Sequence, residues 1–129
     1  MKKITERIKE ERLFFDGGTG TVLQRVGLLP GEPTEVMNTR ARDEVVKLHL
    51  AYLLAGADII KTNTFGINKL KCNDVERELS IALDIAKEAV CLSGKEAYVA
   101  FDVGPTGRML LRLPSLRRSA AGEAAWSAT

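Results

Sequence analysis

Apolar and polar residues follow one another along this chain in blocks that predict alternating helices and strands. A charged stretch over residues 4–12 favours a short helix, and the apolar Leu13–Phe15 run predicts a buried strand that a pair of glycines ends. Residues 21–26 provide one or two helical turns, and the Pro- and Gly-marked stretch over 27–40 predicts a loop. The first forty residues therefore hold one strand between two short helices.

An amphipathic helix is predicted next, over residues 41–56, and it ends at a glycine. The residues on its predicted buried face are Val45, Leu48, His49, Tyr52 and Leu53. The stretch that follows, "ADIIKTNTFG" over residues 57–66, predicts a second strand that runs into a loop at Asn63.

The clearest helix in the chain is predicted over residues 73–94. Asn73 or Asp74 can cap its start, and Gly94 ends it. The residues on its predicted buried face are Val75, Leu79, Ala82, Leu83, Ala86, Ala89 and Val90. A third strand and a glycine loop follow in "AYVAFDVGPTG", which begins at residue 97.

The order strand, helix, strand, helix, strand predicts an α/β fold with parallel strands. Each predicted strand ends in small or polar residues, in "DGGTGT", "TNTFG" and "DVGPTG". Ligands of parallel α/β folds bind at the carboxyl ends of the strands, so the three loops predict three walls of one pocket. Asp16, Asn63 and Asp102 would stand among them. The alternative is that these glycine loops only turn the chain.

Composition and charge limit the class of protein. The chain has 129 residues, of which 45% are hydrophobic and 28% charged, as in a single globular domain. A net charge of +2 gives no reason to expect nucleic acid or a membrane surface as partner. The sequence shows no apolar run of membrane-spanning length and no secretory signal, so we expect a cytoplasmic protein.

The residues with reactive side chains are few. Cys72 and Cys91 are expected to be reduced thiols in helical surroundings rather than metal ligands. His49 is the only histidine, and its place on an apolar helix face predicts a structural role.

Three motifs together resemble the start of the homocysteine S-methyltransferase family. They are "FFDGGTGTVLQRVG", "EVVKLHLAYLLAGADIIKTNTFGINKLK" and "DVGPTGRML", and the resemblance extends over roughly residues 4–110, which is most of the chain. Within the family they look most like the homocysteine-binding module of cobalamin-dependent methionine synthase. The resemblance implies the first three βα units of a TIM (β/α)8 barrel, which is incomplete here because eight units take about 250 residues.

The resemblance also implies a reaction and its cofactors. Family members hold zinc with three cysteines, bind the homocysteine sulfur to it as a thiolate, and transfer a methyl group to that thiolate to give methionine. Zinc removes the thiol proton, and the thiolate is the nucleophile. Cobalamin is the methyl carrier in the methionine-synthase branch. Betaine or S-methylmethionine is the donor in other branches, and the donor stays open for this chain.

The substrate-binding residues carried over from the family are Asp16, Gly17, Gly18, Thr19, Asn63, Thr64 and Asp102. The position of Asp16 is associated with the amino group of homocysteine, and the amides of Gly17, Gly18 and Thr19 with its carboxylate. Carboxylates bind ammonium groups, and bare backbone N–H groups bind anions. Asn63 and Thr64 would be neighbours of the substrate. The third loop would add Asp102, with Gly104 and Thr106, although Asp102 fits a loop-fixing role equally well.

The chain departs from the family in two ways. The zinc-binding cysteines and a later glutamate of the amino-group site are absent, so no catalytic or metal-binding residue is expected here. Residues 1–110 read as the N-terminal part of a homocysteine-binding barrel. Residues 111–129, with five alanines, three arginines and three serines, read as an atypical tail, either out of frame or disordered.

Two other interpretations remain. The chain could be a non-catalytic remnant that binds a partner or associates with itself through open sheet edges. Less favoured is an actin-like or sugar-kinase fragment, in which Asp16 and the following glycines would form a phosphate loop. That fold requires an antiparallel hairpin directly after the loop, and residues 22–35 do not resemble one.

Overall fold

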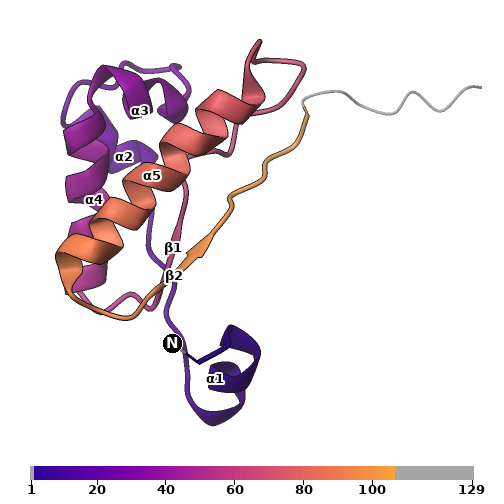
Figure 1. The fold of residues 1–129 in the computed structure, drawn as a ribbon. Helices are drawn as coiled ribbons and strands as arrows, with labels where there is room; N and C mark the ends of the chain where they lie inside the picture. The colour runs from indigo at the N-terminus through magenta and orange to yellow at the C-terminus, as the bar shows by residue number, and fades with distance from the viewer. Residues whose placement is uncertain (1, 107–129) are drawn as a thin grey trace, which may run out of the picture.

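The computed structural model describes residues 2–106, which form an α/β unit with a small parallel sheet (Figure 1). The elements are α1 (Ile4–Glu10), α2 (Gly20–Gln24), the 3₁₀-helix η1 (Thr34–Val36), α3 (Met37–Arg40), α4 (Arg42–Leu54), β1 (Ile59–Lys61), α5 (Val75–Ser93) and β2 (Tyr98–Ala100). The helices predicted over residues 41–56 and 73–94 are confirmed as α4 and α5. No helix within the described residues is long and apolar enough to cross a membrane.

The sheet has two parallel strands, β1 and β2, and a third parallel segment at Phe15 joins β1 through one bridge, so β1 lies in the middle. Ile59 of β1 stands opposite Tyr98 of β2, and Lys61 stands opposite Ala100. On its other side, Ile59 forms a parallel bridge with Phe15. The Asp16 amide donates to the Ile59 carbonyl over 2.9 Å, which continues this pairing to the first polar loop. The predicted parallel order is therefore confirmed.

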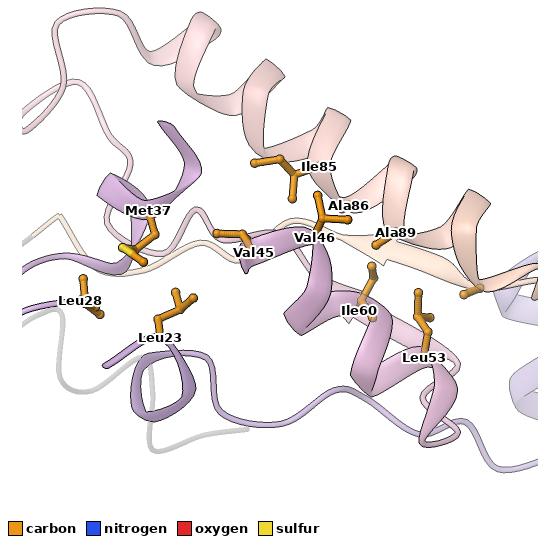
Figure 2. Close-up of a cluster of buried hydrophobic side chains, with 11 residues drawn as sticks. Leu23, Leu28, Met37, Val45, Val46, Leu53, Ile60, Ile85, Ala86 and Ala89 are labelled. Carbon is orange, nitrogen blue, oxygen red and sulfur yellow. The ribbon is translucent and has the colours of Figure 1, made fainter. Parts of the chain in front are cut away.

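The core lies between the sheet and one layer formed by α4 and α5, which pack against each other. Figure 2 shows Ile60 of β1 between these two helices in the view, close to Leu53 of α4 and Ala89 of α5. Ile60, Leu53 and Ile85 are fully buried. Alanines on the buried face of α5 are small enough for the helix to lie close to the sheet. Ile85 also lies on that face, which the sequence pattern did not predict.

The ends of α5 follow the predicted signals. The Asp74 side chain accepts a hydrogen bond from the Arg77 amide over 3.1 Å, which caps the first turn. Gly94 adopts a left-handed conformation with φ of 63°, and the helix ends there.

The N-terminal helix α1 attaches to the opposite end of the sheet from the polar loops (Figure 1). Arg7 pairs with Asp58 over 3.2 Å and stacks over the Tyr98 ring at 5.6 Å. Asp58 also accepts a hydrogen bond from the Phe14 amide, so α1 joins the first and second parallel segments.

Two predictions about the first forty residues are wrong. The Leu13–Phe15 run is not a buried strand: it pairs through one bridge, and Phe14 and Phe15 are 62% and 58% exposed. A segment at the sheet edge has neighbours on one side only. The stretch 27–40 is not all loop, because it contains η1 and α3.

Tertiary contacts explain the turns in that stretch. Arg40 binds the Glu32 carboxylate over 2.7 Å and the Gly27 carbonyl over 2.9 Å, which draws the two ends of the segment together. The Arg40 guanidinium lowers the pKa of Glu32 to about 2. Met37 and Asn38 of α3 are buried against the rest of the unit. The local sequence gave no such signal, since its prolines and glycines are typical of loops.

His49 on α4 makes stability depend on pH. It is fully buried, and both ring nitrogens lack a hydrogen-bond partner within residues 2–106. Burial lowers its pKa from 6.5 to about 4. The unfolded chain therefore binds a proton that the folded chain does not, and acid favours unfolding between these two values.

We expect the free energy of unfolding to fall by up to about 3 kcal/mol between pH 7 and pH 4 because of His49 alone. Urea unfolding at several pH values would measure this dependence. The His49→Leu variant should show a shallower loss over the same range, while the carboxylates affect both proteins alike. An identical pH dependence in both proteins would contradict the prediction.

Candidate functional site

The carboxyl ends of the three parallel segments surround a pocket of about 220 Å³. The residues that line it are Gly17, Gly18, Thr19, Gly20, Thr34, Lys61, Thr62, Asn63, Thr64, Phe65 and Asp102. Six of the seven predicted site residues are in this lining. The seventh, Asp16, lies beside it and bonds to Lys61. The structure thus brings the predicted residues together, although their roles in binding stay predictions.

Asp16 is a buried carboxylate with one oxygen that has no hydrogen bond. Its Oδ2 accepts a bond from the Lys61 amide over 3.0 Å. Its Oδ1 is buried and has no hydrogen-bond partner among residues 2–106, and the Lys61 ammonium stands 3.8 Å away. Burial raises the pKa of Asp16 above its usual value, the Lys61 amide and ammonium oppose this, and the charge of Asp102 adds to it.

The loop after Asp16 offers backbone donors. Within the described residues, the amides of Gly17, Gly18 and Thr19 donate to no protein acceptor. Tyr52 of α4 holds the loop in place, because its hydroxyl donates to the Gly18 carbonyl over 2.8 Å. Three N–H groups are therefore available beside a carboxylate.

Packing against Tyr52 limits the space at Gly17. A Cβ atom at this position would lie 2.8 Å from the Tyr52 hydroxyl oxygen and 2.9 Å from its ring. At Gly18 the nearest atom would be 3.8 Å away, in ordinary contact. From the sequence, the glycines were expected to let a substrate come close to the backbone. The contact between Tyr52 and Gly17 was not predicted.

The side-chain amide of Asn63 forms hydrogen bonds that join neighbouring segments at the edge of the pocket. Its amide nitrogen donates to the Thr34 carbonyl over 2.8 Å and to the Asn38 side-chain oxygen over 2.9 Å. Asn38 donates in return to the Asn63 carbonyl over 2.9 Å. Asn38 is fully buried, and the sequence analysis missed it because a lone asparagine in a predicted loop carries no signal of burial.

Thr64 joins the second loop to the third. Its hydroxyl donates to the Asp102 carbonyl over 2.8 Å and lies 2.7 Å from the Thr62 hydroxyl. The Gly104 amide donates to the Phe65 carbonyl over 3.0 Å, which extends the same junction. Gly104 and Thr106, both within the described chain, do not line the pocket as predicted. A Cβ atom at Gly104 would clash with the Phe65 carbonyl and ring, so these two residues are tightly packed.

Lys61 is the charged pocket residue that the sequence analysis did not identify. It lines the pocket, its side chain is about one-third exposed, and it approaches Asp16. A charged residue between the apolar "ADII" and the polar "TNTFG" is a signal that could have found it.

The cysteines lie away from this pocket. Cys72 lines a larger pocket of about 540 Å³, which the 33–39 and 66–78 stretches enclose, and Cys91 is exposed on α5. Within residues 2–106, no group of three or more His, Cys, Asp or Glu side chains is placed to hold a metal ion. The described residues therefore do not fit a zinc site.

The chain belongs to the homocysteine S-methyltransferase family, since the family model matches residues 13–125. The fold is similar to two crystal structures of the homocysteine methyltransferase MmuM from Escherichia coli, in metallated and oxidized forms. The metallated form is 17% identical with a TM-score of 0.67, and the match covers 79% of this chain and 41% of that one. The oxidized form is 18% identical with a TM-score of 0.67, over 78% and 40%. This chain thus spans about two-fifths of the length of the enzymes it matches.

We expect Gly17→Ala to destabilise the protein by about 1–3 kcal/mol, because the methyl group would displace Tyr52 and break its bond to the Gly18 carbonyl. Urea unfolding would measure the loss. Gly18→Ala is the matched control, and it should leave stability unchanged or raise it by up to about 1 kcal/mol. Equal losses in the two variants would show that Tyr52 does not impose the requirement.

Proposed function

We propose that residues 13–106 form the amino-acid-binding part of a homocysteine S-methyltransferase, within the first three βα units of a (β/α)8 barrel. The observation that carries the proposal is the buried Asp16 oxygen beside the pocket at the strand ends, which has no hydrogen-bond partner within residues 2–106. Family membership supplies the substrate class.

The pocket matches the two charged groups of an amino acid. A buried carboxylate oxygen without a donor binds an ammonium group well, because the new hydrogen bond is charge-assisted and restores a lost contact. The amides of Gly17, Gly18 and Thr19, which donate to no acceptor in the described part of the chain, suit the carboxylate that stands a few ångströms from that ammonium. Asn63 and Thr64 hold the loops that shape this pocket, and Asp102 adds negative charge at its third wall.

The reaction is proposed for the intact family architecture. Methyl transfer forms a bond between the homocysteine sulfur and the methyl carbon, breaks the bond from that carbon to its donor, and yields methionine. The family resemblance implies zinc for activating the thiol, but the described residues do not fit a zinc site, so we assign none of them to that step. Cobalamin as the methyl carrier of the methionine-synthase branch and a cytoplasmic location remain parts of the proposal, and the methyl donor stays open. The atypical tail over 111–129 lies outside the described residues.

The phosphate-loop alternative lacks the element that it requires. The chain after Gly18 enters the helix α2 rather than an antiparallel hairpin, and the described strands pair in parallel. The family match also accounts for the second and third loops, which have no role in a sugar-kinase fragment.

Self-association is a second candidate function, and exposed apolar side chains favour it. Phe15, Phe65, Phe101 and Val103 are 53% to 82% exposed, and they lie in or directly after the three parallel segments. Burying such side chains is favourable by about 25 cal/mol per Å² of apolar area.

We expect L-homocysteine to bind the 129-residue protein and to shift the amide signals of Gly17, Gly18 and Thr19 in a ¹H–¹⁵N NMR titration. The isosteric Asp16→Asn variant should bind about tenfold more weakly or worse, since it loses the charge that pairs with the ammonium. The control ligand 4-sulfanylbutanoate has no ammonium, so it should bind both proteins alike. Absence of L-homocysteine binding to the wild type would refute the proposed function.

For self-association, we expect sedimentation velocity to show a mass that grows with protein concentration. Phe101→Ser should reduce this growth because it removes an exposed ring next to β2. Leu92→Ser on α5 is the matched control, since Leu92 is 60% exposed but lies on the helical layer. A monomer at every concentration would eliminate this second candidate.

A further inference from the structure

Lys61 and Asp16 form a charge pair that is not closed by a hydrogen bond. The Lys61 Nζ stands 3.8 Å from Asp16 Oδ1, which is beyond hydrogen-bond distance for a nitrogen and an oxygen. The Asp16 side chain is 1% exposed, while that of Lys61 is 35% exposed and therefore has room to move. The Asp16 carboxylate is therefore held in place, whereas the Lys61 ammonium can move.

Backbone hydrogen bonds hold Asp16 in place, whereas the Lys61 ammonium has no such bond among the described residues. Asp16 Oδ2 is tied to the Lys61 amide over 3.0 Å, and the Asp16 amide is tied to Ile59 over 2.9 Å. The Lys61 ammonium has Asp16 as its one ion-pair partner among the described residues. A ligand ammonium can therefore replace that of Lys61 at Oδ1 without disturbing the sheet.

Lys61 also lines the same pocket as the amides of Gly17, Gly18 and Thr19. Once it is displaced from Asp16, the Lys61 ammonium would be a mobile positive charge in the pocket, beside the three backbone amides. An amino acid brings its own ammonium and its carboxylate together, so the number of charge pairs in the pocket rises from one to two.

We infer that Lys61 is a specificity-determining residue that exchanges partners, from Asp16 in the free protein to the ligand carboxylate when an α-amino acid binds. This inference rests on the proposed function, because it assumes that Asp16 receives the ligand ammonium. Lys61 would thus favour ligands that carry both an ammonium and a carboxylate over simple amines.

The test compares two ligands on three proteins. L-homocysteine carries both charged groups, whereas 3-aminopropane-1-thiol lacks the carboxylate. In NMR titrations, Lys61→Met should bind L-homocysteine about tenfold more weakly than the wild type does. Its affinity for 3-aminopropane-1-thiol should stay the same or increase, because no lysine competes for Asp16. Lys61→Arg keeps the positive charge and should retain most of the preference for L-homocysteine.

A second readout needs no ligand. The ¹³C signal of the Asp16 carboxyl group can be titrated in wild-type and Lys61→Met proteins, and the pKa of Asp16 should be higher in the variant because a nearby positive charge is gone. Circular dichroism and thermal unfolding would establish that the variant is folded.

The outcomes separate the inference from the proposed function. If the wild type binds no L-homocysteine, the proposed function and the inference both fail. If Lys61→Met binds L-homocysteine as tightly as the wild type, the inference fails and the proposed function stands. An unchanged Asp16 pKa in the folded variant would show that the pair does not form in solution, which also overturns the inference.

Discussion

The burial of three consecutive polar residues after β1 is the constraint on which the rest of this structure depends. Thr62, Asn63 and Thr64 are all at least 94% buried, although they follow the apolar core residue Ile60. Buried polar groups are costly unless they are hydrogen-bonded, so each must find a partner on another segment. Asn63 finds Thr34 and Asn38, and Thr64 finds the Asp102 carbonyl. These bonds fix the position of both neighbouring loops.

Asp16 and His49 are exceptions to this rule of satisfied polar groups among the described residues, and Asp16 lies beside the candidate site. One of its oxygens is bonded to β1, and the other is buried with no donor within hydrogen-bond distance in the described residues. Such an oxygen costs stability in the free protein. A donor from a ligand would recover that cost as binding energy, which gives the pocket a physical reason to select a positively charged group.

The two sides of the sheet have different roles. The helical layer of α4 and α5 covers one face and supplies the core around Ile60 (Figure 2). The strand ends carry the pocket, and Tyr52 links the two by reaching from α4 to the Gly18 carbonyl. The chain spans about two-fifths of the length of the homocysteine methyltransferase structures that it resembles, and within residues 2–106 no group of three or more His, Cys, Asp or Glu side chains is placed to hold a metal ion.

The family, the parallel order of the strands, the two long helices and six of the residues that line the pocket could be predicted from the sequence. Local signals suffice for these features, since caps, glycine ends and apolar spacing act within a few residues. Only the tertiary structure decided that Phe14 and Phe15 are exposed, that residues 34–40 are helical, and that Asn38 is buried. It also decided the approach of Lys61 to Asp16. The burial of Asn38 and the approach of Lys61 to Asp16 depend on contacts between residues 25 and 45 positions apart, respectively, and no local pattern records which buried polar group will meet which partner.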